Sequence, residues 1–340
     1  MKSIGKLTAT SFCIFTFSVV LFLVSLASPN LAELINFEIC QRVRNILGIA
    51  TSTFDFSVFE LMVFVSPVLI FLMLRYIARG KEDVVMRFLR TLSVVLIFPT
   101  LYIFTVGISY IQPSYFDSYN KSVTDEALFL AVNSVIDTVN SESRLLSDEP
   151  SFDEMCPQVE AAFKKTFLKA DLKLPKPKGL LSSKLVSYTG ALAVYSFPTG
   201  EINVNTNAPT YTIPYTLAHE TTHYFGVAHE SDANFLSYLI LSRSDSPYAR
   251  YSASVSVLEY MLADLKRVNV SLYSECFEKL SERAASDISQ GINYARKYNF
   301  TRISQKFDKL NGAHSDIWDK NQIHSYGAVS VYVTNYLNSA

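Results

Sequence analysis

The sequence predicts an α+β protein whose first third is a three-helix transmembrane region. The 340 residues are 49% hydrophobic and only 18% charged, and the apolar excess falls almost wholly before residue 112. Beyond that point, helical patterns surround one short pair of strand-like segments. We therefore expect two parts, a membrane region over residues 1–112 and a second domain over residues 113–340. The net charge of -1 gives no reason to expect a nucleic-acid partner.

Three stretches of the membrane region are long and apolar enough to cross a bilayer, residues 8–27, 56–74 and 91–111. Soluble helices rarely stay apolar on all sides over such a length. Pro99 lies within the third stretch, where a membrane helix tolerates it as a kink. The first stretch follows two lysines and could instead be a cleaved signal peptide. The two later spans favour its retention.

Basic residues predict the orientation of these spans. Those between the second and third spans are Arg75, Arg79, Lys81, Arg87 and Arg90. The loop between the first and second spans is much less basic, so we expect the N-terminus and the Arg75–Arg90 loop in the cytoplasm. Residues 113–340 would then be extracytoplasmic, anchored in the plasma or inner membrane. In that oxidising compartment Cys156 and Cys276 either form a disulfide or stay free, and the sequence leaves both alternatives open.

The strand-like segment, residues 184–205, precedes a long helical region and contains a turn at 198–200. Its second strand, Glu201–Asn205, is either the edge strand that holds an extended substrate or an ordinary strand of the sheet. On the first interpretation, Glu201, Asn203 and Asn205 are substrate-binding residues. Helices are expected at residues 124–147 and 155–169 before this segment.

The motif HETTH, residues 219–223, is the pattern in this chain with the most specific chemistry. On a helix, His219 and His223 lie four residues apart, so both imidazoles project from one face and can bind one Zn²⁺ ion. Glu220 is placed to reach a water molecule beside the metal, which predicts a general base in hydrolysis. Gly226 supplies a stop for this helix.

Two residues compete to be the third metal ligand. The spacing HExxHxxGxxH selects His229, whereas HExxH followed by ExxAN selects Glu230 at the start of a new helix, Glu230–Leu241. With Glu230, Asn234 lies one turn further along and would support a ligand from behind. We favour Glu230, because the first pattern also needs a methionine turn and Met261 lies in a helical segment instead.

The run from Phe197 to Ser252 resembles a family of uncharacterised bacterial membrane proteins, a domain of unknown function presumed to contain zinc peptidases. The shared residues include Thr199-Gly200-Glu201, Pro214, His219-Glu220, His223, Gly226, Glu230, Ala233-Asn234-Phe235, Pro247-Tyr248, Arg250-Tyr251-Ser252 and Ser325-Tyr326-Gly327. Asp232 and Ser246 depart from the family pattern. A histidine at position 229 is not fixed in that pattern, and the ExxAN segment resembles gluzincin-type peptidases, which again favours Glu230.

These observations predict a membrane-anchored, zincin-like metallopeptidase that cleaves a peptide or protein substrate outside the cytoplasm. His324 and Tyr326 could stabilise the oxyanion of the reaction, although a structural role is the more conservative interpretation. Two alternatives remain: a membrane-anchored binding or assembly module with a structural zinc site, and a hydrolase of non-peptide amides. The sequence predicts neither the substrate nor the oligomeric state.

Overall fold

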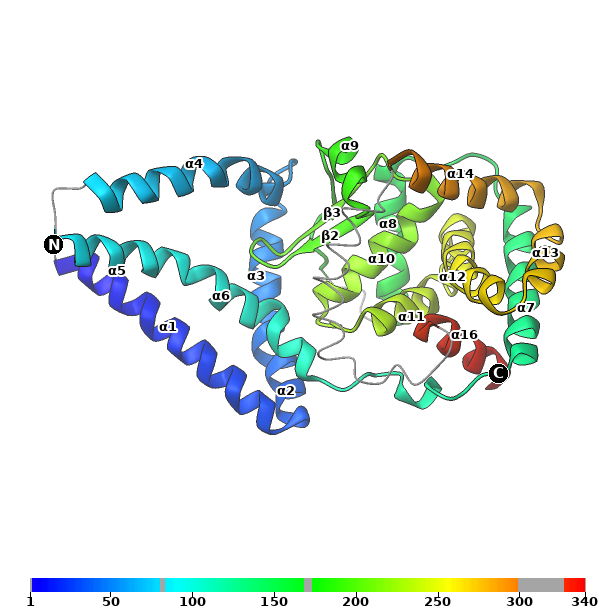
Figure 1. Cartoon of the computed structure of the whole chain (residues 1–340), viewed down its shortest axis with the longest axis horizontal. Helices are drawn as coiled ribbons and strands as arrows, with labels where there is room; N and C mark the ends of the chain where they lie inside the picture. The colour runs from blue at the N-terminus through cyan, green and yellow to red at the C-terminus, as the bar shows by residue number, and fades with distance from the viewer. Residues whose placement is uncertain (1, 80–82, 168–172, 299–326, 340) are drawn as a thin grey trace.

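The structure, a computed structural model, describes residues 2–79, 83–167, 173–298 and 327–339. It is mostly helical, with one small sheet of three strands (Figure 1). Membrane-length helices form one end of the molecule, the sheet lies near the middle beside α3, and most of the remaining helices form the other end. The sheet is smaller than the sequence predicts, because residues 183–189 form the helical turns α9 (Ser183–Val186) and η5 (Ser187–Thr189) instead of a strand.

Among the described residues, three helices are long and apolar enough to cross a membrane. They are α1 (Lys2–Ala27), α4 (Val58–Arg79) and the continuous run from Val84 to Ile111. This run comprises α5 (Val84–Val95), α6 (Ile97–Tyr102), η2 (Ile103–Gly107) and η3 (Ile108–Ile111). It is interrupted at Leu96, three residues before Pro99, as expected where proline removes a helical hydrogen bond. Arg87 lies on α5 and donates to the carbonyl of Tyr76 near the end of α4.

The segment between the first two membrane helices is itself helical. It contains α2 (Pro29–Ile35), η1 (Asn36–Cys40) and α3 (Gln41–Thr51), which stands beside the sheet (Figure 1). We call residues 28–57 the connecting segment. It packs on the domain that begins after residue 112, so the two parts that the sequence predicts share an extensive contact.

The second domain is built around α12 (Pro247–Val268), a helix buried along most of its length. Small residues in its first half, among them Ala249, Ser252 and Ala253, let the neighbouring helices approach closely. The helices expected near residues 124–147 and 155–169 are present as α7 (Asp125–Ser143) and α8 (Phe152–Thr166). The remaining helices are α10 (Ile213–Tyr224), α11 (Glu230–Leu241), α13 (Val270–Glu278), α14 (Glu282–Tyr298) and α16 (Ala328–Ser339).

The sheet has the strand order β1 (Lys178–Gly179), β3 (Glu201–Val204), β2 (Ala193–Ser196). Strands β2 and β3 pair antiparallel across the expected turn, where Gly200 adopts a φ of 67°. Strand β3 is therefore central, and the interpretation of Glu201–Asn205 as an edge strand is wrong. Among the described residues, the edge nearest to α10 belongs to β2.

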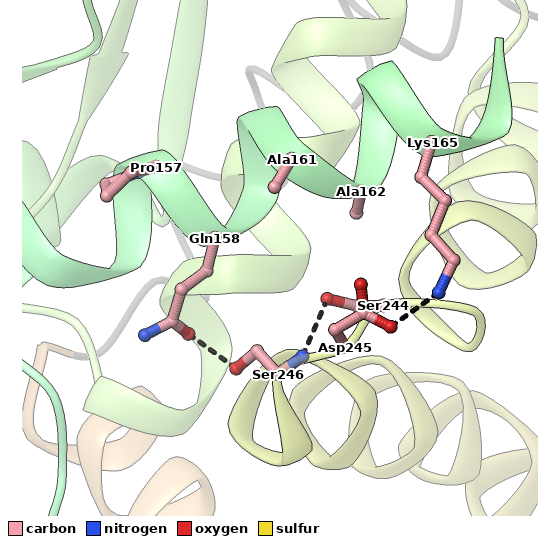
Figure 2. Close-up of a pocket in the computed structure, with 8 residues that line it drawn as sticks. All are labelled: Pro157, Gln158, Ala161, Ala162, Lys165, Ser244, Asp245 and Ser246. Atoms are coloured by element: carbon pink, nitrogen blue, oxygen red, sulfur yellow. Dashed lines mark hydrogen bonds and ion pairs between the residues drawn. The ribbon is translucent and has the colours of Figure 1, made fainter. Parts of the chain in front are cut away.

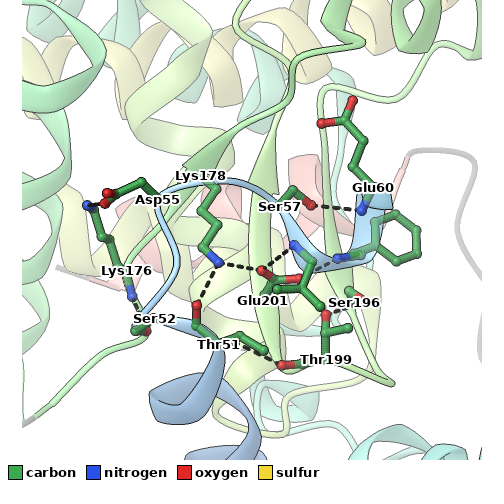
Figure 3. A network of polar contacts seen from close by, with 12 residues as sticks. Thr51, Ser52, Asp55, Ser57, Glu60, Lys176, Lys178, Ser196, Thr199 and Glu201 are labelled. Atoms are coloured by element: carbon green, nitrogen blue, oxygen red, sulfur yellow. Dashed lines mark hydrogen bonds and ion pairs between the residues drawn. The ribbon is translucent and has the colours of Figure 1, made fainter. Parts of the chain in front are cut away.

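The polar face of β3 packs on the connecting segment and the start of α4 (Figure 3). The Glu201 carboxylate accepts hydrogen bonds from the backbone N–H groups of Val58 and Phe59, at 2.9 and 2.7 Å. It also forms an ion pair with Lys178 at 2.5 Å, with both side chains only 1% exposed. In return, Glu60 on α4 accepts from the N–H groups of Leu181 and Ser182 at 3.0 and 2.6 Å. The negative charge of Glu201 complements the positive N-terminal end of α4.

Cys156 and Cys276 are free thiols, so the disulfide alternative is not realised. Cys156 lies on α8, whereas Cys276 on α13 is buried against α7, where its sulfur is 3.9 Å from the amide nitrogen of Asn133.

Candidate metal centre

Helices α10 and α11 bring the HETTH motif and the following acidic residue together. Helix α10 has a proline, Pro214, in its first turn, where the missing N–H costs no hydrogen bond. It ends before Gly226, whose φ of 85° reverses the chain in a conformation that favours glycine. Helix α11 then begins at Glu230, with His229 at its N-cap. The expected bounds of the second helix are therefore confirmed.

Three side chains from these helices converge on one point. The Nε2 atoms of His219 and His223 are 3.0 Å apart, and the Glu230 carboxylate oxygens lie 3.2 Å from the first and 3.5 Å from the second. Two ligands at 2.0–2.1 Å from one tetrahedral zinc ion are about 3.3 Å apart. The cluster therefore has the composition and the spacing that a zinc ion requires.

A hydrogen bond of one of the two imidazoles, that of His223, fits the same interpretation. His223 Nδ1 lies 2.7 Å from the carbonyl oxygen of Val227, so this nitrogen carries a proton and the ring is held with Nε2 facing the cluster. His219 Nδ1 is buried without a hydrogen-bond partner among the described residues. Burial lowers the pKa of His223, but the negative charge of Glu230 outweighs it and raises this pKa to about 9. Two imidazoles and a carboxylate this close therefore attract a positive charge.

Glu220 lies beside the cluster and faces the edge of the sheet. Glu220 is only 7% exposed, and its Oε2 accepts a hydrogen bond from the backbone N–H of Tyr195 at 2.5 Å. The strand β2 thus lies directly against the expected general base. The sequence contains no signal for this contact, because the two residues are on separate elements joined by a loop and a strand.

His229, the competing third ligand, faces a different partner. Its Nε2 lies 2.8 Å from the carbonyl oxygen of Gln112, and its ring meets that of Tyr110 edge-on at 6.4 Å. The structure therefore brings Glu230, and not His229, to the two histidines of the motif. Asn234 lies one turn beyond Glu230 and accepts a hydrogen bond from the Tyr215 hydroxyl at 3.2 Å. That bond links α11 to α10 near the cluster.

The three expected substrate-binding residues on and after β3 are buried, which is a correction. Glu201 is 1% exposed, and Asn203 and Asn205 are 0% exposed. Asn205 donates to the carbonyl of Ala191 at 3.0 Å, whereas both amide atoms of Asn203 lack a partner among the described residues. These side chains belong to the interior because both faces of β3 are covered. His324 and Tyr326 lie outside the described residues.

A cavity of about 270 Å³ lies elsewhere on the domain, between α8 and the turn that precedes α12 (Figure 2). Its walls include Pro157, Ala161 and Ala162, and an ion pair between Lys165 and Asp245 closes one side at 2.5 Å. None of the residues of the metal cluster lines it. It is therefore separate from the candidate metal centre.

Sequence comparison places most of this chain in one family. The model of the family described as "Protein of unknown function (DUF3810)" matches residues 37–329. This range includes most of the connecting segment, the second and third membrane helices, and His219, His223 and Glu230. No curated protein and no solved structure matches the chain. The match covers far more than half of the 340 residues, so the chain belongs to the DUF3810 family.

Proposed function

We propose that this protein is a membrane-anchored zinc peptidase. The observation that supports this best is the convergence of His219, His223 and Glu230 at separations of 3.0–3.5 Å, with the Glu220 carboxylate next to them. Catalytic zinc sites use three protein ligands and leave a position open for water or substrate. A structural site needs no adjacent carboxylate, so Glu220 favours hydrolysis.

The residues of the site have distinct tasks in this proposal. His219, His223 and Glu230 would hold a zinc ion, whose Lewis acidity makes water acidic enough to lose a proton near neutral pH. Glu220 takes that proton at Oε2 and later delivers it to the leaving amine. The Tyr195 N–H on β2 donates to the same carboxylate, so an incoming peptide that replaces Glu220 as its acceptor would leave the carboxylate free for the proton. Val227 keeps the His223 ring in the orientation that binding requires.

The same proposal places the site outside the cytoplasm. Arg75 and Arg79 lie in the last part of α4, and Arg87 and Arg90 lie on α5. Lys81 lies between these helices in the sequence, outside the described residues. Basic residues of this kind stay on the cytoplasmic side. A reporter enzyme that is active only after export should therefore be active when fused after Gln112. A reporter that is active only in the cytoplasm should be silent there, and the reverse pattern would invert the topology.

The test of the function is a comparison of the full-length protein with its Glu220→Gln variant in detergent. Both should bind about one zinc per chain, because glutamine leaves the three ligands in place. Wild type should cleave an unstructured polypeptide, whereas the variant should be at least about a hundredfold slower, because only the proton acceptor is gone. Equal activities would exclude Glu220 as the base, and absence of zinc from both proteins would contradict the proposal as a whole.

A further inference from the structure

The residues that flank the candidate ligand Glu230 are hydrogen-bonded to the segment that directly follows the third membrane helix. Gln112, the first residue after that helix, accepts a hydrogen bond from His229 at 2.8 Å. Ser114 and the N–H of Tyr115 donate to the carboxylate of Asp232 at 2.6 and 2.8 Å. These three bonds hold His229 and Asp232, which flank Glu230 in the sequence. The candidate ligand Glu230 is therefore held, through His229 and Asp232, against the residues that directly follow the third membrane helix.

The turn between β2 and β3 reaches further toward the membrane. The ring of Phe197 meets that of Tyr102 edge-on at 5.7 Å, and Tyr102 precedes the end of the third membrane helix by nine residues, about 13 Å along the helix axis. On the other side of the turn, a Cβ on Gly200 would lie only 2.6 Å from the backbone nitrogen of Gly48. The turn is thus packed between the third membrane helix and α3 of the connecting segment, on the side of the domain that faces the membrane helices.

One edge of β2 is available for pairing beside Glu220. The Leu192 carbonyl accepts from Asn205 across the sheet at 2.9 Å, and the alternation of an antiparallel ladder then directs Ala193 and Tyr195 outward. The Tyr195 N–H indeed points away from β3, since it donates to Glu220. Among the described residues, no strand pairs with this outer edge. From Ala193 to Ser196 the strand runs toward the turn, and so toward the membrane.

We propose that the substrate is a polypeptide tethered to the same membrane by its N-terminal end, cut in the extended segment that leaves the bilayer. This inference rests on the proposed peptidase function. A peptide that pairs antiparallel with β2, the slightly more stable arrangement, enters at Phe197 and runs outward past Glu220. Its N-terminal side is then at the bilayer, and its C-terminal side is in the aqueous phase. A tether at the C-terminus would require the opposite direction.

The experiment uses the full-length protein in lipid vesicles and a pool of unstructured 30-residue polypeptides of randomised sequence. One sample of the pool is coupled to maleimide lipid through an N-terminal cysteine, one through a C-terminal cysteine, and one is left free. The two tethered samples have the same surface concentration, so their comparison isolates direction. N-terminally tethered peptides should be cut at least tenfold faster than C-terminally tethered ones. Their cuts should lie within the first 10 residues or so, a reach of about 33 Å.

A second readout does not need turnover. In the Glu220→Gln background, Phe197 is replaced by the photoreactive residue p-benzoylphenylalanine, and crosslinks to the tethered peptides are mapped by mass spectrometry. We expect crosslinks to the residues next to the N-terminal tether. Crosslinks that fall evenly along the peptide would contradict entry at the turn.

The outcomes separate the two proposals. If free and tethered peptides are cut equally fast and Glu220→Gln abolishes both reactions, the peptidase function stands and membrane tethering is overturned. Faster cleavage of the C-terminally tethered sample overturns the direction of entry. If wild type cuts none of the three samples, in vesicles or in detergent, the peptidase function itself fails.

Discussion

Two regions of this molecule build the candidate site in opposite ways. The hairpin of α10 and α11 supplies all three candidate ligands and the candidate base from residues 219–230. The membrane brace, which we define as Asn36, Arg44, Glu60 and Gln112 with the Lys178–Glu201 pair, joins residues far apart in sequence. Asn36 Nδ2, for example, donates to the carbonyl of Gly226, 190 residues away. The chemistry is therefore local, whereas the position of the chemistry relative to the membrane depends on distant contacts.

From this comparison we expect substitutions in the α10–α11 hairpin to have the largest effects on zinc binding and activity. Glu230→Ala should strip most of the zinc from the protein, because it removes one of three ligands. His229→Ala should keep the zinc and much of the activity, because its ring contacts Gln112 and Tyr110 instead. Metal content after dialysis, measured by atomic emission, distinguishes the two variants. Loss of zinc from His229→Ala but not from Glu230→Ala would show that the site uses three histidines.

A substitution in the membrane brace should lower the stability of the fold without removing a candidate zinc ligand. Lys178→Met leaves the Glu201 carboxylate buried without its cation, and breaking a buried pair in this way destabilises proteins by about 3–5 kcal/mol. Thermal unfolding in detergent measures the loss. The double variant Lys178→Met/Glu201→Gln should recover part of it, because no unpaired charge remains.

A matched control exists nearby, on the same loop. Lys176 pairs with Asp55 at 2.7 Å, but these side chains are 58% and 92% exposed (Figure 3). Lys176→Met should leave the unfolding temperature unchanged, since exposed pairs contribute little. If Lys178→Met also left the unfolding temperature unchanged, the contact between the sheet and α4 would not stabilise the fold.

Gly226, in the α10–α11 hairpin, contacts two residues of the membrane brace. A Cβ there would lie 2.5 Å from Arg44 Nη2 and 2.6 Å from Asn36 Nδ2, in addition to the strain of a φ of 85°. Gly226→Ala should therefore destabilise the protein by more than the roughly 1–2 kcal/mol that a left-handed alanine costs, and it should weaken zinc binding. Gly190, with a φ of 84°, is the control for the strain alone. Equal effects of Gly226→Ala and Gly190→Ala on both readouts would rule out coupling between brace and site.

The same contrast explains what the sequence could predict. The spans, the helix α11 and the stop at Gly226 follow from patterns within a few residues, and the structure agrees with each of them. The preference for Glu230 as a ligand stays a prediction, although the structure brings its carboxylate to both histidines. The sequence leaves open whether β3 is an edge strand or an ordinary strand, and the structure realises the second alternative. The distinction depends on β1 at Lys178–Gly179, two residues without a strand signal. The short span between Lys184 and Thr189 became helical for a similar reason: alternation over so few residues does not distinguish a strand from a helical turn.

Arg44 shows the limit most clearly. It is 0% exposed, and it donates to the carbonyl of Thr105 at 3.1 Å and to Gln41 Oε1 at 2.8 Å. In the sequence it is one of two arginines, with Arg42, in the segment between the first and second membrane spans, where it would count only toward the orientation of the spans in the membrane. Only the packing of α3 against the third membrane helix makes it an interior residue that supports Gly226. No local pattern could have predicted this.

The smallest predicted effect concerns Glu259, a carboxylate in neither region. Whereas Glu201 has a lysine beside it, Glu259 on α12 accepts a hydrogen bond from the Tyr211 hydroxyl at 2.8 Å. Burial raises the pKa of Glu259 to about 7, further helped by the negative charge of Asp287 and opposed by the Tyr211 bond. Because the pKa in the folded state lies above its unfolded value of about 4.5, stability is present below pH 4.5 and is lost as the pH rises toward 7.

Glu259→Gln removes that titration while its amide oxygen can still accept from Tyr211. The variant should therefore match wild type near pH 4.5 and be more stable at pH 8, by at most about 3 kcal/mol. Unfolding temperatures at the two pH values measure the difference. Glu275→Gln is the control, because Glu275 pairs with Lys279 at a site where their side chains are 52% and 43% exposed. An effect of Glu259→Gln on stability that is the same at pH 4.5 and at pH 8 would mean that folding does not raise the pKa of Glu259. The Tyr211 hydroxyl would then be enough to keep this buried carboxylate charged, as the lysine does for Glu201.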